Sequence, residues 1–169
     1  MAISMSTASV PVFRHMLLNL SHFLDKAAAC AEARKFEPSN LLNDRLAPDM
    51  LPFTKQVQIA SDSAKLCIAR IAGVEWPKYE DTETTIPELK ARIQKTLDFI
   101  ASVPASQLDG AEAKEIVLPT GRDSTRTMTA EDYLRFHALP NFFFHVTTAY
   151  DILRHNGVPL GKQTFLGNR

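Results

Sequence analysis

Apolar residues recur at steps of three and four along four long segments of the chain, which is the spacing of an amphipathic helix. The pattern predicts helices over about residues 9–34, 49–73, 85–103 and 129–156. Between the last two, residues 114–128 alternate apolar and polar positions around a Thr-Gly-Arg-Asp turn, which predicts a small β-hairpin. The predicted fold class is all-α, a single domain over residues 1–169, built as an antiparallel four-helix bundle with the hairpin before the last helix.

Capping residues mark the ends of these segments. Ser9, with a proline two residues later, predicts the start of the first helix, because proline suits a first helical turn. Gly73 predicts the end of the second, since glycine adopts the left-handed conformation without steric cost. Thr85 and Glu88 have the spacing of a capping box at the start of the third. Thr129 is the predicted cap of the last helix.

Composition narrows the class of protein. A length of 169 residues and a mass of 18.8 kDa fit one domain, and 19 Lys and Arg balance 19 Asp and Glu without a block of one sign. Nucleic acid and anionic membrane surfaces are therefore not expected partners. No run approaches the roughly 20 apolar residues of a membrane span, and no leader is recognisable. With Cys30 and Cys67 interpreted as reduced core residues, the expected location is the cytoplasm.

The last helix carries the candidate chemistry. His137, Asn141 and His145 form a polar stripe at steps of four on a helix that is otherwise rich in phenylalanine. Such a stripe is costly to bury unless its groups are paired, so neighbouring side chains, water, a ligand or a metal must satisfy it. The two histidines lie about 12 Å apart along the axis at 1.5 Å per residue, which is too far for both to bind one ion. Pro140 interrupts the stripe and predicts a kink.

The second helix offers polar groups that could face this stripe. Gln56 lies at the edge of its apolar face, and Gln58 and Asp62 lie further round. We therefore predict a small-molecule site between the second and last helices. Its predicted ligand-binding residues are Gln56, Gln58, Asp62, His137 and Asn141, and its predicted catalytic residue is His145.

Two long stretches carry a family resemblance, LAPDMLPFTKQVQIASDSAKLCIARIAG (residues 46–73) and ALPNFFFHVTTAYDILRHNGVPLG (residues 138–161). They resemble an uncharacterised bacterial family, a domain of unknown function within the DinB/YfiT-like superfamily of inferred metalloenzymes. The resemblance implies a bundle with up-down-down-up helix order and a homodimer. It also implies a divalent metal, zinc or nickel, held by three histidines, and chemistry of the kind found in thiol-dependent transferases and isomerases.

The three metal-binding positions of the superfamily are only partly kept. The last histidine corresponds to His145, and the position four residues before it is Asn141. The remaining histidine, from the second helix, corresponds to Gln58 by counting back from Gly73, or to Gln56 by the phase of the apolar face. Two of three ligands are thus amides, which bind zinc or nickel more weakly than imidazole does.

Three hypotheses follow for the function. The first is a metal-free pocket for a small molecule or thiol, with His145 as hydrogen-bond partner or general base. The second is a reshaped site for zinc or nickel in a transferase or hydrolase-like enzyme, in which His145 recovers the ion with His137, Asp62 or Asp49. The third is a structural homodimer without catalysis, in which the polar stripe is an internally satisfied network.

Overall fold

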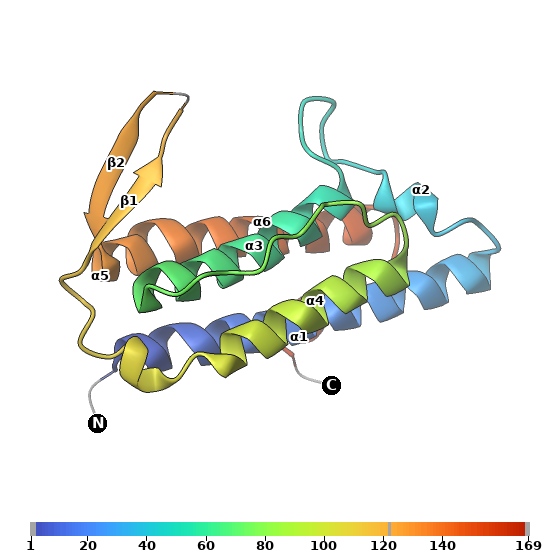
Figure 1. Ribbon diagram of the computed structural model, residues 1–169. Helices are drawn as coiled ribbons and strands as arrows, with labels where there is room; N and C mark the ends of the chain where they lie inside the picture. Colours follow the sequence, from blue (N-terminus) through green and yellow to red (C-terminus); the bar gives the residue numbers. More distant parts are fainter. Residues whose placement is uncertain (1–2, 122, 168–169) are drawn as a thin grey trace.

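The computed structural model describes residues 3–121 and 123–167 of the chain. Within these residues, four long helices lie side by side, α1 (Met5–Arg34), α3 (Phe53–Ala72), α4 (Ile86–Ser102) and α6 (Leu139–His155) (Figure 1). Helix α3 packs against both α4 and α6, and α1 closes the group by packing against the same two helices. The mostly helical class predicted from the sequence is confirmed.

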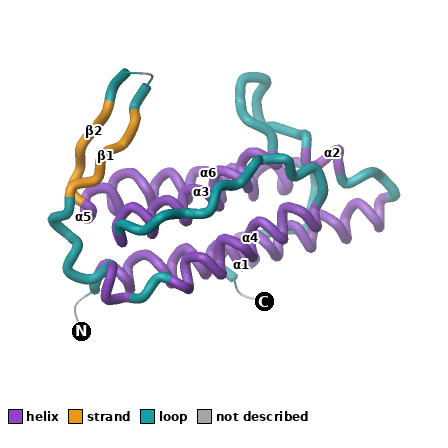
Figure 2. The backbone as a smooth tube through the Cα atoms, viewed as in Figure 1, coloured by secondary structure: helices purple, strands orange, loops and turns teal. Residues whose placement is uncertain are grey.

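Short elements connect and flank these helices. The antiparallel strands β1 (Glu115–Pro119) and β2 (Thr125–Thr129) form the predicted hairpin, which projects from one end of the molecule (Figure 2). Short helices complete the chain: α2 (Ser39–Leu42), the 3₁₀ turn η1 (Ala105–Gln107) and α7 (Lys162–Leu166). The loop of residues 73–85 runs lengthwise from the end of α3 to the start of α4 (Figure 2).

The apolar faces of the long helices meet in one core. Phe13 of α1 and Phe142 of α6 are both fully buried, and their rings meet edge to face at 4.9 Å between centroids. Cys30 and Cys67 are buried in this core with free thiols, and burial raises the pKa of the Cys67 thiol. In the part of the chain that the structure describes, no helix is both long and apolar enough to cross a membrane.

Three predicted caps are confirmed. Gly73 ends α3 with φ of 74°, a left-handed conformation that favours glycine. Thr85 and Glu88 exchange both bonds of a capping box: the hydroxyl accepts from the Glu88 N–H, and the carboxylate accepts from the Thr85 N–H at 2.9 Å. The Thr129 hydroxyl accepts from the Asp132 N–H at 3.1 Å.

Two predicted helix starts are wrong. Helix α1 begins before Ser9, because Ser4 and Thr7 form a reciprocal capping box one turn earlier. The Ser9 hydroxyl instead donates to the Met5 carbonyl at 2.6 Å inside the helix. Helix α3 begins after residue 49, because Pro52 is extended, with ψ of 167°, and so delays the first turn.

The predicted last helix is one continuous helical rod with a wide turn in it. It consists of α5 (Ala130–Tyr133), a π-helical segment η2 (Leu134–Ala138) and α6. Pro140 follows the π-helical segment and has no N–H for the carbonyl of Phe136. A π turn changes the register of backbone hydrogen bonds, so it accommodates the missing donor without ending the helix.

Candidate functional site between α3 and α6

Three side-chain hydrogen bonds join α3 to α6 and its N-terminal extension, and we call this set the α3–α6 seam. They pair Gln56 Oε1 with His145 Nδ1 at 2.7 Å, Asn141 Nδ2 with Ser63 Oγ at 2.8 Å, and Arg70 Nη1 with Tyr133 Oη at 3.0 Å. The partners ascend along α3 while they descend along the other segment, so the two run antiparallel. The seam therefore places polar side chains of both segments against each other over most of the length of α3.

The Gln56–His145 hydrogen bond defines which ring nitrogen of His145 carries a hydrogen. Gln56 Nε2 donates to the Leu51 carbonyl at 2.8 Å, which turns its Oε1 toward His145. An amide oxygen only accepts, so His145 Nδ1 carries the hydrogen. Burial lowers the pKa of His145 and favours the neutral ring, since only 9% of the residue is exposed. Nε2 then carries a lone pair, and it has no hydrogen-bond partner among the described residues.

Gln58 and Asp62 belong to a different arrangement, which we call the Arg92 cluster. The Arg92 side chain on α4 is 1% exposed and pairs with three carboxylates, Asp62 Oδ2 at 3.0 Å, Asp81 Oδ1 at 2.7 Å and Glu83 Oε1 at 3.1 Å. Gln58 Nε2 donates to Glu83 Oε2 at 2.9 Å, and the Gln58 carbonyl accepts from Arg92 Nη2 at 3.3 Å. The cluster thus joins α3, α4 and the loop of residues 73–85.

A second cation completes the Arg92 cluster. The buried Lys65 Nζ lies 2.6 Å from Asp62 Oδ1, and the Tyr79 ring lies 3.6 Å from Lys65 Nζ and 4.7 Å from the Arg92 guanidinium carbon. Burial opposes ionisation of Glu83, but hydrogen bonds from its own backbone N–H, Arg92 and Gln58 hold its pKa below its usual value. The two buried cations therefore offset most of the negative charge of the three carboxylates.

The position of Gln58 on the helix gives a wrong prediction of its burial. The helical spacing places Gln58 further from the apolar face of α3 than Gln56, yet both side chains are buried. The loop of residues 73–85 covers this side of α3 and brings Glu83 over the Gln58 side chain. A loop that crosses from elsewhere leaves no trace in the periodicity of the helix that it covers.

A cavity of about 170 Å³ lies along the seam, between α3 and the rod formed by α5, η2 and α6. Its lining combines polar and apolar residues: Ile59, Asp62, Ser63, Leu66, Arg70, Tyr133, His137, Ala138 and Asn141. Three predicted site residues, Asp62, His137 and Asn141, are thus brought together. The other three, Gln56, Gln58 and His145, are not among its lining residues.

The cavity offers both donors and acceptors. The Ser63 hydroxyl donates to the Ile59 carbonyl at 2.7 Å, so it accepts from Asn141 Nδ2 and leaves Asn141 Oδ1 as an acceptor without a partner in the described residues. Burial raises the pKa of Tyr133 to about 12, which keeps its O–H as a donor. Burial, together with the charges of Arg70 and Arg126, lowers the pKa of His137 and favours its neutral ring.

Sequence reasoning missed Arg70 and Tyr133. Arginine in the last turn of a helix is commonly a partner of the helix dipole, and a tyrosine in a helix rich in phenylalanine has the pattern of a core residue. Tyr133 also stacks on His137, with 5.6 Å between ring centroids. No local signal distinguishes these two residues; the antiparallel contact of their helices brings them together.

Comparison with other proteins identifies the family of this chain. The family model of a domain of unknown function, DUF1993, matches residues 5–166. The chain belongs to the DUF1993 family. In a crystal structure, a DinB family member from Shewanella denitrificans has the same fold, with a TM-score of 0.90 and 41% sequence identity over 96% of this chain and 91% of that one. No curated protein matches the chain. The resemblance to an uncharacterised DinB-like family is therefore confirmed.

The residues of this chain do not fit the three-histidine metal site that the resemblance implies. Gln56 Oε1 and Asn141 Nδ2 already hydrogen-bond to His145 and Ser63, and both amides are neutral. Among the described residues, no group of three His, Cys, Asp or Glu side chains is placed to hold an ion. A single imidazole with two amides is a poor donor set for zinc or nickel.

We predict that Arg92→Met lowers the free energy of unfolding by about 3 kcal/mol, because it removes the buried partner of three carboxylates. Urea unfolding measures this change. The matched control is Arg135→Met, whose exposed pair with Glu131 is expected to contribute about 0.5 kcal/mol or less. Equal losses in the two variants would contradict a central role for the Arg92 cluster.

We also predict that stability falls on acidification partly through His145. Its pKa is lower in the folded than in the unfolded chain, so its contribution is complete above the unfolded pKa of about 6.5 and is lost as pH falls through the folded pKa. Urea unfolding at pH 7.5 and 5.5 tests this, and His145→Gln is expected to show the smaller loss. The exposed His155→Gln is the control. An unchanged loss in His145→Gln would refute the assignment.

Proposed function

We propose that this DUF1993 protein binds a small polar molecule in the cavity along the α3–α6 seam, without a metal. The observation that carries the proposal is that Asp62, His137 and Asn141, three polar residues from both sides of the seam, line one cavity of about 170 Å³. At about 30 Å³ per water molecule, this volume suits a ligand the size of an amino acid or a short thiol.

The chemistry of the lining favours a ligand that both donates and accepts. Arg70 and the Tyr133 hydroxyl are donors, and Asn141 Oδ1 is an acceptor. The Asp62 carboxylate contributes little free charge, because Arg92 and Lys65 already pair with it. A small zwitterion such as cysteine matches this set, and its thiol corresponds to the chemistry that the superfamily resemblance implies.

His145 is the proposed hydrogen-bond partner or general base of the site. It lies one helical turn beyond Asn141, and Gln56 orients its ring with Nδ1 protonated. A neutral imidazole with a lone pair on Nε2 has the protonation state that a base requires. The role applies to ligands that extend along the seam past Asn141.

The test is titration with L-cysteine and with L-serine, followed through the backbone amide resonances of the protein. We expect saturable shifts around Ser63 and Asn141, and at least about tenfold weaker binding in Asn141→Leu, which removes the amide and fills the cavity. Thr147→Leu places the same side chain at an exposed position of α6 and is the control. Equal binding in both variants, or no saturable response in the unmodified protein, would contradict the proposal.

A second candidate function, the homodimer, is favoured by two exposed rings. Phe136 and Phe144 lie on the rod formed by η2 and α6 and are 62% and 56% exposed. Exposed aromatic side chains of this size are typical of interfaces. We propose a homodimer through this surface. We also propose the up-down-down-up helix order for each protomer, which the course of the coloured chain in Figure 1 supports.

Sedimentation velocity tests the dimer. Phe136→Asp and Phe144→Asp are expected to shift a dimer to monomer while leaving the fold intact, because both rings are exposed. Leu166→Asp alters another exposed apolar residue, on α7, and is the control. A monomer in the unmodified protein, or a dimer that survives both phenylalanine variants, would remove this surface from consideration.

A further inference from the structure

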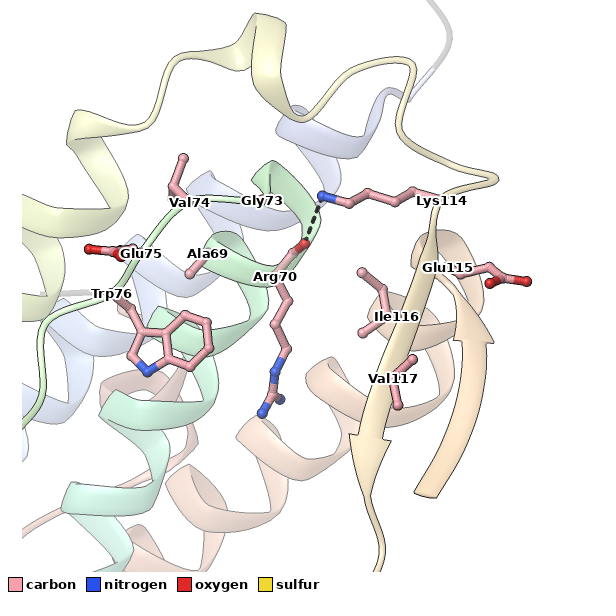
Figure 3. Close-up of a pocket in the computed structure, with 10 residues that line it drawn as sticks. All are labelled: Ala69, Arg70, Gly73, Val74, Glu75, Trp76, Lys114, Glu115, Ile116 and Val117. Carbon is pink, nitrogen blue, oxygen red and sulfur yellow. Dashed lines mark hydrogen bonds between the residues drawn. The ribbon is translucent and has the colours of Figure 1, made fainter. Parts of the chain in front are cut away.

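A second cavity borders the C-terminal end of α3 and shares only Arg70 with the cavity along the α3–α6 seam. It measures about 400 Å³, a volume typical of small-molecule sites, and lies between the C-terminal turn of α3, the start of the following loop and the segment entering β1 (Figure 3). Its walls include Ala69 and Arg70 on α3, Trp76 on the loop, and Ile116 and Val117 on β1. Nothing in the proposed function uses this cavity.

Arg70 supplies a positive charge to this cavity. Its guanidinium lies 6.0 Å from the Trp76 ring centroid and 5.9 Å from that of Tyr133, and the Tyr133 hydroxyl accepts one of its hydrogen bonds. Among the described residues no carboxylate pairs with Arg70. The side chains of Glu75 and Glu115 border the cavity but point away from Arg70 (Figure 3). The guanidinium therefore keeps donors available for an anion.

Lys114 removes an obstacle to anion binding. The C-terminal end of a helix carries partial negative charge, which would repel an anion. Lys114 Nζ donates to the Arg70 carbonyl at 3.2 Å (Figure 3) and to the Ile71 carbonyl at 3.0 Å, and so compensates this charge. Gly73 makes the contact possible, because a Cβ there would lie 2.7 Å from Lys114 Nζ.

Three apolar side chains also line the cavity, Trp76, Ile116 and Val117. Trp76 is 43% exposed and Val117 is 57% exposed, although both are large hydrophobic side chains. Together with Ile116 they border the space beside the guanidinium (Figure 3). An indole ring offers a stacking surface to a planar ligand, and a guanidinium matches a carboxylate with two parallel hydrogen bonds.

We propose that this cavity binds a small aromatic carboxylate, with Arg70 holding the carboxylate and Trp76 stacking on the ring. The site is distinct from the cavity of the proposed function, although Arg70 borders both. Two residues distinguish the cavities in an experiment, because Val117 lines only this cavity and Asn141 lines only the other.

The intrinsic fluorescence of the protein reports on this site directly, because Trp76 is its single tryptophan. Titration of the full chain with benzoate is expected to change the fluorescence saturably, whereas the neutral isostere benzamide is expected to leave it unchanged. Arg70→Met is expected to weaken benzoate binding about tenfold or more, and Arg70→Lys is expected to restore only part of it. Arg14→Met, at an exposed position of α1, is the charge-matched control.

Two further variants keep the test decisive. Val117→Asp introduces a negative charge at an exposed wall position without touching the core, so it should abolish benzoate binding even if Arg70→Met fails to fold. Asn141→Leu should leave benzoate binding intact. The proposal is overturned if benzoate gives no saturable response, if benzamide binds equally well, or if Val117→Asp has no effect. Loss of benzoate binding in Asn141→Leu alone would move the ligand to the α3–α6 cavity and would also overturn it.

Discussion

The buried charge of Arg92 is the constraint on which much of the surrounding structure depends. A guanidinium that is 1% exposed is stable only where carboxylates and carbonyl oxygens surround it. Here α3 contributes Asp62 and the Gln58 carbonyl, and the loop of residues 73–85 contributes Asp81 and Glu83. The long loop that returns from the end of α3 to the start of α4 is thereby held against both helices, and its position also determines where Trp76 lies at the other end of α3.

The polar residues of α3 therefore belong to two different sets of contacts, the Arg92 cluster and the α3–α6 seam. Gln58 and Asp62 face the Arg92 cluster, where their polar atoms satisfy Arg92, Lys65 and Glu83. Gln56 faces α6 and the His145 ring in the α3–α6 seam. Asp62 alone belongs to both settings, since it also borders the cavity along the seam. The polar residues of α3 that the sequence assigns to one site are therefore partly structural and partly open to a ligand.

The family relationship connects these polar residues with the metal-binding positions that the resemblance implies. In this DUF1993 chain, amides stand at two of the three positions where the resemblance implies histidines, and each amide has a hydrogen-bond partner. Amide–imidazole and amide–hydroxyl bonds join α3 to α6 without an ion. In this arrangement Asn141 Oδ1 and His145 Nε2 are acceptors without a partner among the described residues, which is the basis for proposing a metal-free small-molecule site.

The sequence by itself determined the four long helices, the hairpin, the caps at Gly73, Thr85 and Thr129, and the two segments that carry the polar stripe, because periodicity and capping are local properties. It did not determine the start of α1, which Ser4 caps in place of the predicted Ser9, or the π turn before Pro140. Only the tertiary structure decided which polar residues meet. Arg70 with Tyr133, Gln58 with Glu83, and Lys114 with the end of α3 are pairs that lie 25 to 63 residues apart, and the packing of helices and loop brings them into contact.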